Sequence, residues 1–454
     1  MFGDAKLGDR RRVKRLIEIF EQTRKHPGGT LPDKLKSPMD LKALYRWCAC
    51  PDVTHRAIIE AMGRHALRQL DSDVKTVLVL HDATELDYTS ITSLADQLGQ
   101  IGKGLSRGYI CHNSLAVTAD GREILGLTNQ ILHRRDDVPE KETMLQRRQR
   151  ESRESRLWLQ GTAGLPRDQR LVDVCDQGSD TFEFLEHEFL SGRRFVIRSK
   201  RQRCVYLGHE ARGLRETLDR QAARLPVLGQ RVLKIQSQKG KRSHRAREVT
   251  LEVRGGPILV PRPHARHGEY QGIRMPIWAV RVFETKPPRG AEALEWVLLT
   301  NEPITTYEDA LRVVEWYELR WIVEEFHKAM KTACGIENMQ FTVTARLEPM
   351  VAVLSAVATT LLNLRGASRR EDAKTRPATE VIAVEYVRVL SGWRYRHVRE
   401  DLTIHEFFFA LARLGGHQNR KHDKQPGWLV LWRGWSTLQA MLDGADAIRR
   451  KKCG

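Results

Sequence analysis

The spacing of apolar residues separates helical stretches from strands along this chain. In residues 1–70, apolar side chains recur every three or four positions, which is typical of amphipathic helices. Further on, short runs rich in Val, Ile and Leu predict buried strands, at residues 76–80, 112–118, 123–132, 171–175 and 194–198. Helical stretches separate the later strands, at about residues 141–161 and 181–190. This order predicts an α/β fold built around a mixed sheet.

The pattern then changes for about a hundred residues. The segment 200–302 has little helical character and contains several β-like runs, at residues 232–237, 248–253, 258–261, 276–284 and 296–300. Loops rich in glycine, proline and basic residues join these runs, for example at 238–248. We interpret the segment as a β-rich insertion. Its basic loops predict either contacts with phosphates or an ordinary solvated surface.

Helical patterns return after the insertion and continue to the end of the chain. They cover residues 317–331, 349–364, 381–390, 404–414 and 428–442. A polar stretch at 365–380 separates the second of these helices from the third. We therefore expect three units: a helical unit over 1–70, an α/β unit over 71–366 that contains the insertion, and a helical unit over 367–454.

The helix expected at 317–331 places an unusual set of side chains on one face. At 3.6 residues per turn, Tyr317, Arg320, Glu324, Lys328 and Lys331 line up. An ion pair between neighbouring turns stabilises a helix by only about 0.3–0.5 kcal/mol, so this is a weak structural device. A carboxylate among cations does suit a site that holds a divalent metal and a phosphodiester. The alternative is a solvated helix face.

Two further acids follow predicted strands. Asp82 comes just after the first strand and Asp176 directly after the fourth. If these strands are neighbours in the sheet, both carboxylates meet Glu324 at one place. Converging carboxylates can hold two divalent cations about 3.5–4 Å apart, which is the arrangement used for phosphoryl transfer. Each acid taken alone is more often a surface residue.

Composition indicates the kind of partner and the compartment. The 454 residues include 76 Lys and Arg against 57 Asp and Glu, a net charge of +19 that favours a polyanion such as nucleic acid. A basic soluble enzyme is the alternative. The seven cysteines form no CxxC pair, which argues against a zinc site and for a reducing compartment. No secretory leader is expected, and the apolar run at 349–364 is shorter than a membrane span.

These motifs resemble the insertion-sequence-four family of DDE transposases. The family signature Y-x2-R-x3-E-x6-K is present as Tyr317, Arg320, Glu324 and Lys331, within the longer match RW-x-x-EEFHKA-x-KT. Shorter matches occur along most of the chain, namely LGDRRR, VCD at 174–176, RFVIRSK at 194–200, LEWVLLTNEP at 294–303, ARLGG at 412–416 and LW-x-GW at 431–435. The chain departs from the family pattern at His81 and Ile322.

The resemblance implies a role for each of these residues. Asp82, Asp176 and Glu324 correspond to the metal-binding catalytic triad, which takes two Mg²⁺ or Mn²⁺ ions. Contacts with DNA are implied for the other signature residues and for two more positions, namely Tyr317, Arg320, Lys331, Arg198 and Trp296. Trp296 would stack on a flipped base, or it is a core aromatic. Arg11 and Arg15 are our candidates for DNA contact in the amino-terminal unit, as opposed to a solvated charged surface.

The resemblance also implies a ribonuclease-H-like catalytic core and cut-and-paste transposition of a bacterial insertion sequence. Its steps are nicking, hairpin formation and opening, and strand transfer. The partners are then double-stranded DNA and a second copy of the chain, in the bacterial cytoplasm at the nucleoid. The homodimer would form through the carboxy-terminal unit, whose apolar residues alternatively pack within the chain, namely Phe407, Phe408, Leu411, Trp432, Leu438 and Leu442. A ribonuclease-H-fold nuclease and a non-cleaving DNA-binding relative are the other functional hypotheses.

Overall fold

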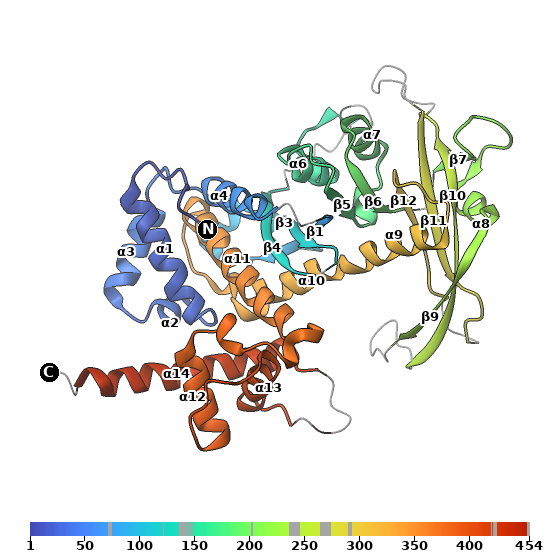
Figure 1. Cartoon of the computed structure of the whole chain (residues 1–454). Helices are drawn as coiled ribbons and strands as arrows, with labels where there is room; N and C mark the ends of the chain where they lie inside the picture. Colours follow the sequence, from blue (N-terminus) through green and yellow to red (C-terminus); the bar gives the residue numbers. More distant parts are fainter. Residues whose placement is uncertain are drawn as a thin grey trace.

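The fold is described here from a computed structural model of the whole chain. It describes residues 1–451 except 71–74, 121, 136–142, 144–145, 147–148, 201–202, 236–245, 264–273, 289–292, 419 and 421–424. Residues 238–245 of the predicted basic loop lie outside the described residues, as do residues 141–142, 144–145 and 147–148 of the helix predicted at 141–161. Within the described part of that stretch, residues 150–153 are not helical, so it is not one continuous helix. Four amino-terminal helices, a long sheet and a carboxy-terminal group of helices follow one another along the chain (Figure 1).

The amino-terminal unit is helical, as predicted. Its helices are α1 (Arg10–Lys25), α2 (Leu31–Leu35), α3 (Pro38–Cys48) and α4 (His55–Arg68). Side-chain caps fix where they begin: Asp9, Ser37 and Thr54 each accept a hydrogen bond from a backbone N–H of the first turn. The short helix α2 has no counterpart in the sequence prediction.

One lysine of this unit is buried against the middle of the chain. Lys34 is 1% exposed, and its ammonium donates hydrogen bonds to the carbonyl oxygens of Pro27, Gly29 and Cys334, the last at 2.9 Å. Burial lowers the pKa of Lys34 to about 8. Cys334 lies some 300 residues away in sequence, so Lys34 joins the amino-terminal unit to the segment that follows the signature residues.

The five predicted strands form the first part of a mixed sheet. They are β1 (Val77–Asp87), β3 (Arg107–Thr118), β4 (Ile124–His133), β5 (Leu171–Cys175) and β6 (Arg194–Arg198). Their order across the sheet is β4–β3–β1–β5–β6. β1 pairs antiparallel with β3 and parallel with β5, and β5 pairs parallel with β6. The short strand β2 (Gly99–Gln100) also pairs with β3.

The insertion continues this same sheet. Its elements are β7 (Cys204–Leu207), β8 (Glu216–Thr217), α8 (Leu218–Arg224), β9 (Val227–Ile235), β10 (Arg247–Val260), β11 (Met275–Glu284) and β12 (Glu295–Thr300). The runs predicted separately at 248–253 and 258–261 belong to the single strand β10, which passes through Gly255 and Gly256 without a turn. β12 pairs with β6, so the described strands make one continuous sheet.

Helices cover both faces of the first part of the sheet. On one face lie α6 (Leu157–Ala163) and α7 (Phe182–Ser191), packed against odd-numbered residues such as Cys175 and Ile197. On the other lie α9 (Tyr307–Leu319) and α10 (Trp321–Lys328), which share a core with even-numbered residues such as Leu80 and Val174. The alternation of side chains along each strand therefore assigns neighbouring residues to opposite faces. In Figure 1, α9 and α10 run along the sheet towards the amino-terminal helices.

The chain after α10 is helical to its end. A π-helical turn (Ala329–Ala333) leads to α11 (Thr344–Ala367), followed by α12 (Val384–Tyr395), α13 (Ile404–Leu414) and α14 (Trp428–Lys451). Short 3₁₀ turns occur along the chain at Thr92–Gln97, Glu154–Arg156, Gln177–Ser179, Ile336–Asn338, Glu371–Lys374 and Ala378–Glu380. By length and composition α11 is apolar enough to cross a membrane, but 78% of its apolar window is buried inside the protein.

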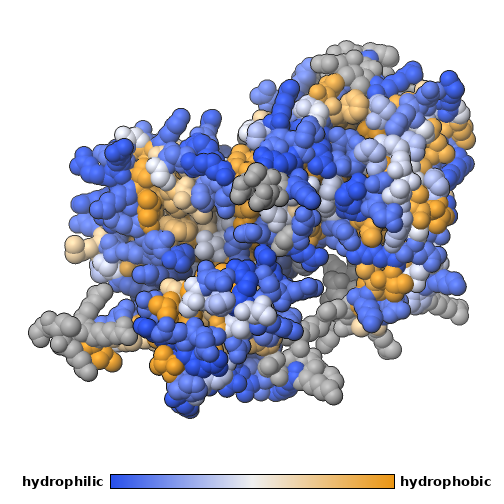
Figure 2. Space-filling view, in the orientation of Figure 1, coloured by the Kyte–Doolittle hydropathy of each residue, from blue (hydrophilic) through white to orange (hydrophobic). Residues whose placement is uncertain are grey.

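The apolar residues predicted to face a second subunit are instead packed within the chain. Phe407, Phe408, Leu411, Leu438 and Leu442 are all at most 8% exposed and form one core between α12, α13 and α14. Trp432 is partly buried beside Gly28 of the amino-terminal unit. For these residues the alternative of packing within the chain is confirmed, since amphipathic periodicity identifies a face that must be covered and does not say what covers it. The homodimer itself stays a prediction. The visible surface of the molecule is mostly hydrophilic (Figure 2).

Candidate functional site

Two of the three predicted acids lie side by side because of the strand register. His81 of β1 is the partner of Cys175 on the parallel strand β5. Asp82 and Asp176 are the residues that follow these two partners in sequence. Both have the same parity as the core residues beneath α10, and both therefore face that helix. One detail of the prediction is wrong: β1 continues to Asp87, so Asp82 lies inside the strand and not after its end. The longer strand is held by pairing with β3 as far as Gly108.

A break in the signature helix brings Glu324 to the same place. We expected one helix over 317–331, but α9 ends at Leu319 and α10 begins at Trp321. The backbone N–H of Arg320 bonds to the carbonyl of Tyr317, three residues back, which is the tighter 3₁₀ pattern. Tyr317, Arg320 and Glu324 still lie together, whereas Lys331 lies in the π-helical turn and pairs with Glu337.

Arg320 bridges two of the acids. Its Nη1 donates to Asp82 Oδ2 at 2.5 Å, and its Nη2 donates to Glu324 Oε1 at 2.7 Å. The guanidinium also lies over the ring of Tyr317, 5.7 Å from the ring centre. Attraction to Asp82, Tyr317 and Glu324 raises the pKa of Arg320 despite the opposing effect of its burial. Arg320 therefore stays charged between the carboxylates.

Positive charge does not fully compensate the acids. Burial raises the pKa of Asp82 to about 6; Arg320 opposes this, while the charges of Asp176 and Glu324 add to it. Burial likewise raises the pKa of Asp176, against the charges of Arg320, Lys200 and Arg198. Acids held with raised pKa values in a crowded group are typical of functional sites.

The three acids offer the kind of ligand atom that a divalent cation binds. Carboxylate oxygens are the ligands that Mg²⁺ and Mn²⁺ prefer, and three are available here. As the side chains stand, no group of three or more His, Cys, Asp or Glu in the described part of the chain is placed to hold a metal ion. In this site Arg320 pairs with both Asp82 and Glu324.

The remaining predicted residues lie at different distances from the acids. Arg198 ends β6, and its charge acts on Asp176. Lys331 lies in the π-helical turn, where its ammonium is 3.2 Å from Glu337 Oε1 and makes no described contact with the three acids. Trp296 lies on β12, on the same side of that strand as Leu298, the partner of Arg198. Its indole Nε1 is buried with no hydrogen-bond partner, and its ring packs partly into the main core.

The two predicted arginines of the amino-terminal unit differ in exposure. The Arg11 side chain is 92% exposed and pairs only with Asp9, at 3.2 Å. The Arg15 side chain is 37% exposed and lies near Glu18 and Asp40, at 3.0 and 3.6 Å. Arg11 is thus open to a ligand, whereas two carboxylates already offset the charge of Arg15.

Sequence reasoning missed two residues beside the site. Trp321 follows Arg320 and is 54% exposed, with the ammonium of Lys328 4.4 Å from the centre of its ring. Lys200 follows β6 and acts on Asp176 through its charge. An exposed tryptophan next to buried acids is a signal of binding, but the single-helix prediction had assigned Trp321 no role.

The opposite face of the same strands carries a second polar cluster. Asp173 of β5 is fully buried, with its Oδ1 2.9 Å from His81 Nε2 and its Oδ2 2.7 Å from Arg193 Nε. His81 Nδ1 lies 3.0 Å from Ser114 Oγ. Burial alone would raise the pKa of Asp173, but His81 and Arg193 outweigh it and lower that pKa. We call these four residues the buried cluster.

Comparison with known families identifies the amino-terminal unit. Residues 1–53 match the family model described as transposase DNA-binding. The match covers α1, α2 and α3, and it includes Arg11 and Arg15. This part of the chain is thus a DNA-binding domain of the transposase type, which supports DNA as a partner and a transposase as the class of protein.

Proposed function

We propose that the chain is a DDE transposase of the insertion-sequence-four family that performs cut-and-paste transposition. The single observation that carries the proposal is the meeting of Asp82, Asp176 and Glu324 beside Arg320, in a chain whose first residues match a transposase DNA-binding domain. The strand order β4–β3–β1–β5–β6 supports a ribonuclease-H-like core. The proposed domains are 1–70 for DNA binding, 71–366 for catalysis and 367–454 for dimerisation.

Asp82, Asp176 and Glu324 would hold two Mg²⁺ or Mn²⁺ ions. When bound, such ions lower the pKa of a water molecule and stabilise charge on the attacking and leaving oxygens of a phosphodiester. The chain's own contribution is orientation. β1 and β5 fix Asp82 and Asp176 side by side, and α10 places Glu324 opposite them. Arg320 exchanges its carboxylate partners for phosphate oxygens when DNA enters, which frees Asp82 and Glu324.

The proposed reaction has four phosphoryl-transfer steps on DNA. Water first nicks one strand at the transposon end, and the released 3′-hydroxyl attacks the opposite strand to make a hairpin. A second water opens the hairpin, and the 3′-hydroxyl then attacks target DNA. Tyr317, Arg320, Lys331 and Arg198 bind the backbone, while Trp321 and Trp296 offer aromatic surfaces to an unstacked base. The proposed location is the bacterial cytoplasm, at the nucleoid.

The proposed assembly is a homodimer on DNA in which each subunit cuts the end held mainly by the other. Because the apolar residues predicted for the contact are already buried or partly buried, we expect the contact to use other surfaces of the carboxy-terminal unit. A mixing experiment tests the arrangement. Glu324→Ala protein is combined with protein carrying Arg11→Ala, which keeps its triad. Cleavage restored only in the mixture supports it, and no restoration when both variants fold and assemble rejects it.

The central test is strand joining. Purified full-length protein is incubated with Mg²⁺, a plasmid carrying its gene with the flanking DNA, and a second plasmid as target. We expect excision and joining in the target, both lost with Glu324→Gln or with chelator. Cleavage without joining would favour a ribonuclease-H-fold nuclease. Binding without cleavage would favour a non-cleaving relative.

A further inference from the structure

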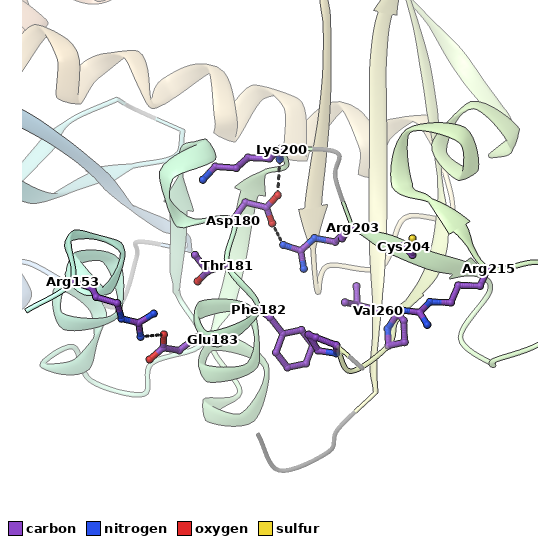
Figure 3. A pocket seen from close by; sticks show the side chains of 12 residues that line it. Arg153, Asp180, Thr181, Phe182, Glu183, Lys200, Arg203, Cys204, Arg215 and Val260 are labelled. Atoms are coloured by element: carbon purple, nitrogen blue, oxygen red, sulfur yellow. Dashed lines mark hydrogen bonds and ion pairs between the residues drawn. The ribbon is translucent and has the colours of Figure 1, made fainter. Parts of the chain in front are cut away.

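A cavity of about 410 Å³ opens beside the acidic site, on the side of the insertion. Its walls come from three segments far apart in sequence: the start of α7, the stretch after β6 and the end of β10. We call it the α7 pocket, and it is shown in Figure 3. Its volume falls in the range of sites that bind small organic groups, about 300–1,000 Å³.

One part of the α7 pocket is positively charged. Four cations line it, Arg153, Lys200, Arg203 and Arg215, against two carboxylates. Those carboxylates are already engaged: Glu183 pairs with Arg153 at 2.6 Å, and Asp180 pairs with Arg203. The remaining positive charge suits a phosphate group.

Two of the cations have unused donors. In the described part of the chain, the Nε atoms of Arg203 and Arg215 are both buried without a hydrogen-bond partner. The Arg203 side chain is 14% exposed, and burial lowers its pKa to about 10. A buried guanidinium N–H without an acceptor is costly, and a phosphate or carbonyl oxygen in the pocket would satisfy it.

The other part of the α7 pocket is apolar. Phe182, Val260, Pro261 and Pro263 line it. In Figure 3 the ring of Phe182 and the side chain of Val260 border the same space as Arg203 and Arg215. A flat apolar group fits between them, and a base on a phosphate-bearing strand combines both chemistries.

The α7 pocket lies within a few nucleotides of the acids. Asp176 and Asp180 are joined by one 3₁₀ turn, so their Cα atoms are at most roughly 14 Å apart. Stacked nucleotides rise about 3.4 Å each, which makes this about four nucleotides. Lys200 connects the two places, since it lines the pocket and its charge acts on Asp176.

We propose that the α7 pocket holds an unstacked nucleotide of the DNA strand whose neighbouring phosphodiester lies at Asp82, Asp176 and Glu324. Arg203 and Arg215 bind its phosphate, and its base packs against Phe182. This assignment rests on the proposed function, and it uses a different face of the sheet from Trp296 and Trp321, since Phe182 belongs to the core under α6 and α7.

The test measures binding of fluorescent duplexes by anisotropy, in chelator and at fixed salt. The probes are a blunt duplex, the same duplex with a four-nucleotide single-stranded 3′ or 5′ end, and versions in which that end is abasic. We expect full-length protein to bind one of the single-stranded ends at least about fivefold more tightly than the blunt duplex, as base stacking on an aromatic predicts. The abasic version should lose most of this gain.

Two variants and a matched control locate the effect. Arg215→Gln should lower the preference for single-stranded ends without changing affinity for the blunt duplex. Arg220→Gln removes the same charge from a side chain that is 75% exposed and outside the pocket, and it should change neither. Phe182→Leu should lose only the difference between normal and abasic ends. Thermal unfolding checks that each variant is folded, and Arg215→Gln keeps the test open if Phe182→Leu is not.

The outcomes separate the pocket from the proposed function. The α7 pocket is rejected if Arg215→Gln and Arg220→Gln weaken blunt and single-stranded probes equally, or if abasic ends bind as well as normal ones. If the preference is found and depends on Phe182 and Arg215 while strand joining fails, the pocket is supported and the transposase proposal falls. If strand joining succeeds but no preference for single-stranded ends is found, the transposase proposal is supported and the α7 pocket is rejected.

Discussion

The two faces of β1 and β5 carry acids in opposite conditions. On the α10 face, Asp82 and Asp176 share one guanidinium with Glu324, and burial raises their pKa values. On the α7 face, Asp173 is equally part of β5 but has His81 and Arg193 as partners, and its pKa is lowered. Asp173 is the more deeply buried, with a side chain that is 0% exposed against 16% for Asp82, so its lowered pKa comes from its partners and not from its burial. Glu188 on the same face shares Arg193 at 3.7 Å, and burial and the charge of Asp173 raise the pKa of Glu188. Charges that are fully paired hold a fold together, whereas acids left short of positive charge are available to a ligand.

The largest difference is expected between Asp176→Asn and Asp173→Asn in activity. Asp176→Asn should reduce DNA cleavage at least about 10²–10³-fold, because it removes a ligand for the cation that stabilises the transition state. Its stability should be unchanged or slightly higher, since a buried carboxylate with a raised pKa is costly to ionise. Single-turnover cleavage and chemical denaturation measure the two effects. Normal cleavage by Asp176→Asn would contradict the site.

Asp173→Asn should show the opposite behaviour. It leaves Arg193 buried with Glu188, 3.7 Å away, as its remaining carboxylate partner, and breaking a buried pair in this way costs up to about 3–5 kcal/mol of unfolding free energy. Urea denaturation measures the loss. Any cleavage that remains, per folded molecule, should be close to that of the unchanged protein. A stable Asp173→Asn protein with lost activity would mean that the buried cluster takes part in the reaction.

The pH dependence of stability tests whether the buried side chain of His327 is neutral. Burial lowers the pKa of His327 to about 3, and its Nε2 lies 3.1 Å from Asn113 Nδ2, so His327 is neutral in the folded chain. The unfolded chain binds a proton near pH 6.5 and the folded chain does not, so stability is lost as the pH falls below 6.5. Between pH 7 and 5 this amounts to about 2 kcal/mol. Over the same pH range, the free energy of unfolding of His327→Gln should fall by about 2 kcal/mol less than that of the unchanged protein. Denaturation at each pH measures the difference.

The smallest effect is expected from Ser114→Ala. The hydroxyl lies 3.0 Å from His81 Nδ1, and a neutral hydrogen bond of this kind contributes about 1 kcal/mol. The change removes one contact of the buried cluster and leaves Asp173 paired with Arg193. A loss as large as that of Asp173→Asn, measured in the same denaturant, would show that His81 depends on Ser114 for its orientation.

Periodicity alone predicted most elements of the fold. The strands at 171–175 and 194–198 and the helix at 404–414 have the bounds that the sequence indicated, because each is short, strongly apolar and flanked by clear caps or turns. The end of β1 was missed because its last residues include Thr84, Glu85 and Asp87, which pair with β3 and do not look like a strand. Tertiary pairing overrides local propensity there.

The sequence analysis named the three acids but did not predict that Arg320 pairs with Asp82 and Glu324. Asp82, Asp176 and Glu324 were selected from their positions at predicted strand ends and on the signature helix, and from the family resemblance; the pairing of β1 with β5 then brings the first two together. Nothing local shows that the helix breaks at Arg320, since Tyr317 to Glu324 contains no glycine or proline; the break accompanies contacts with Asp82, 238 residues away. The α7 pocket was beyond prediction for the same reason, because its walls come from three separate segments.

Lys34 limits which amino-terminal units could replace the one in this chain. Its ammonium satisfies carbonyl oxygens on both sides of the junction between the amino-terminal unit and the turn that carries Lys331. A chimaera that takes its first 53 residues from another transposase, without a long basic side chain at position 34, would leave the Cys334 carbonyl buried and unpaired. The amino-terminal unit and the segment after α10 are therefore not independent of each other in this chain, and a change in the surface of α1 to α3 has to leave the base of that unit fixed.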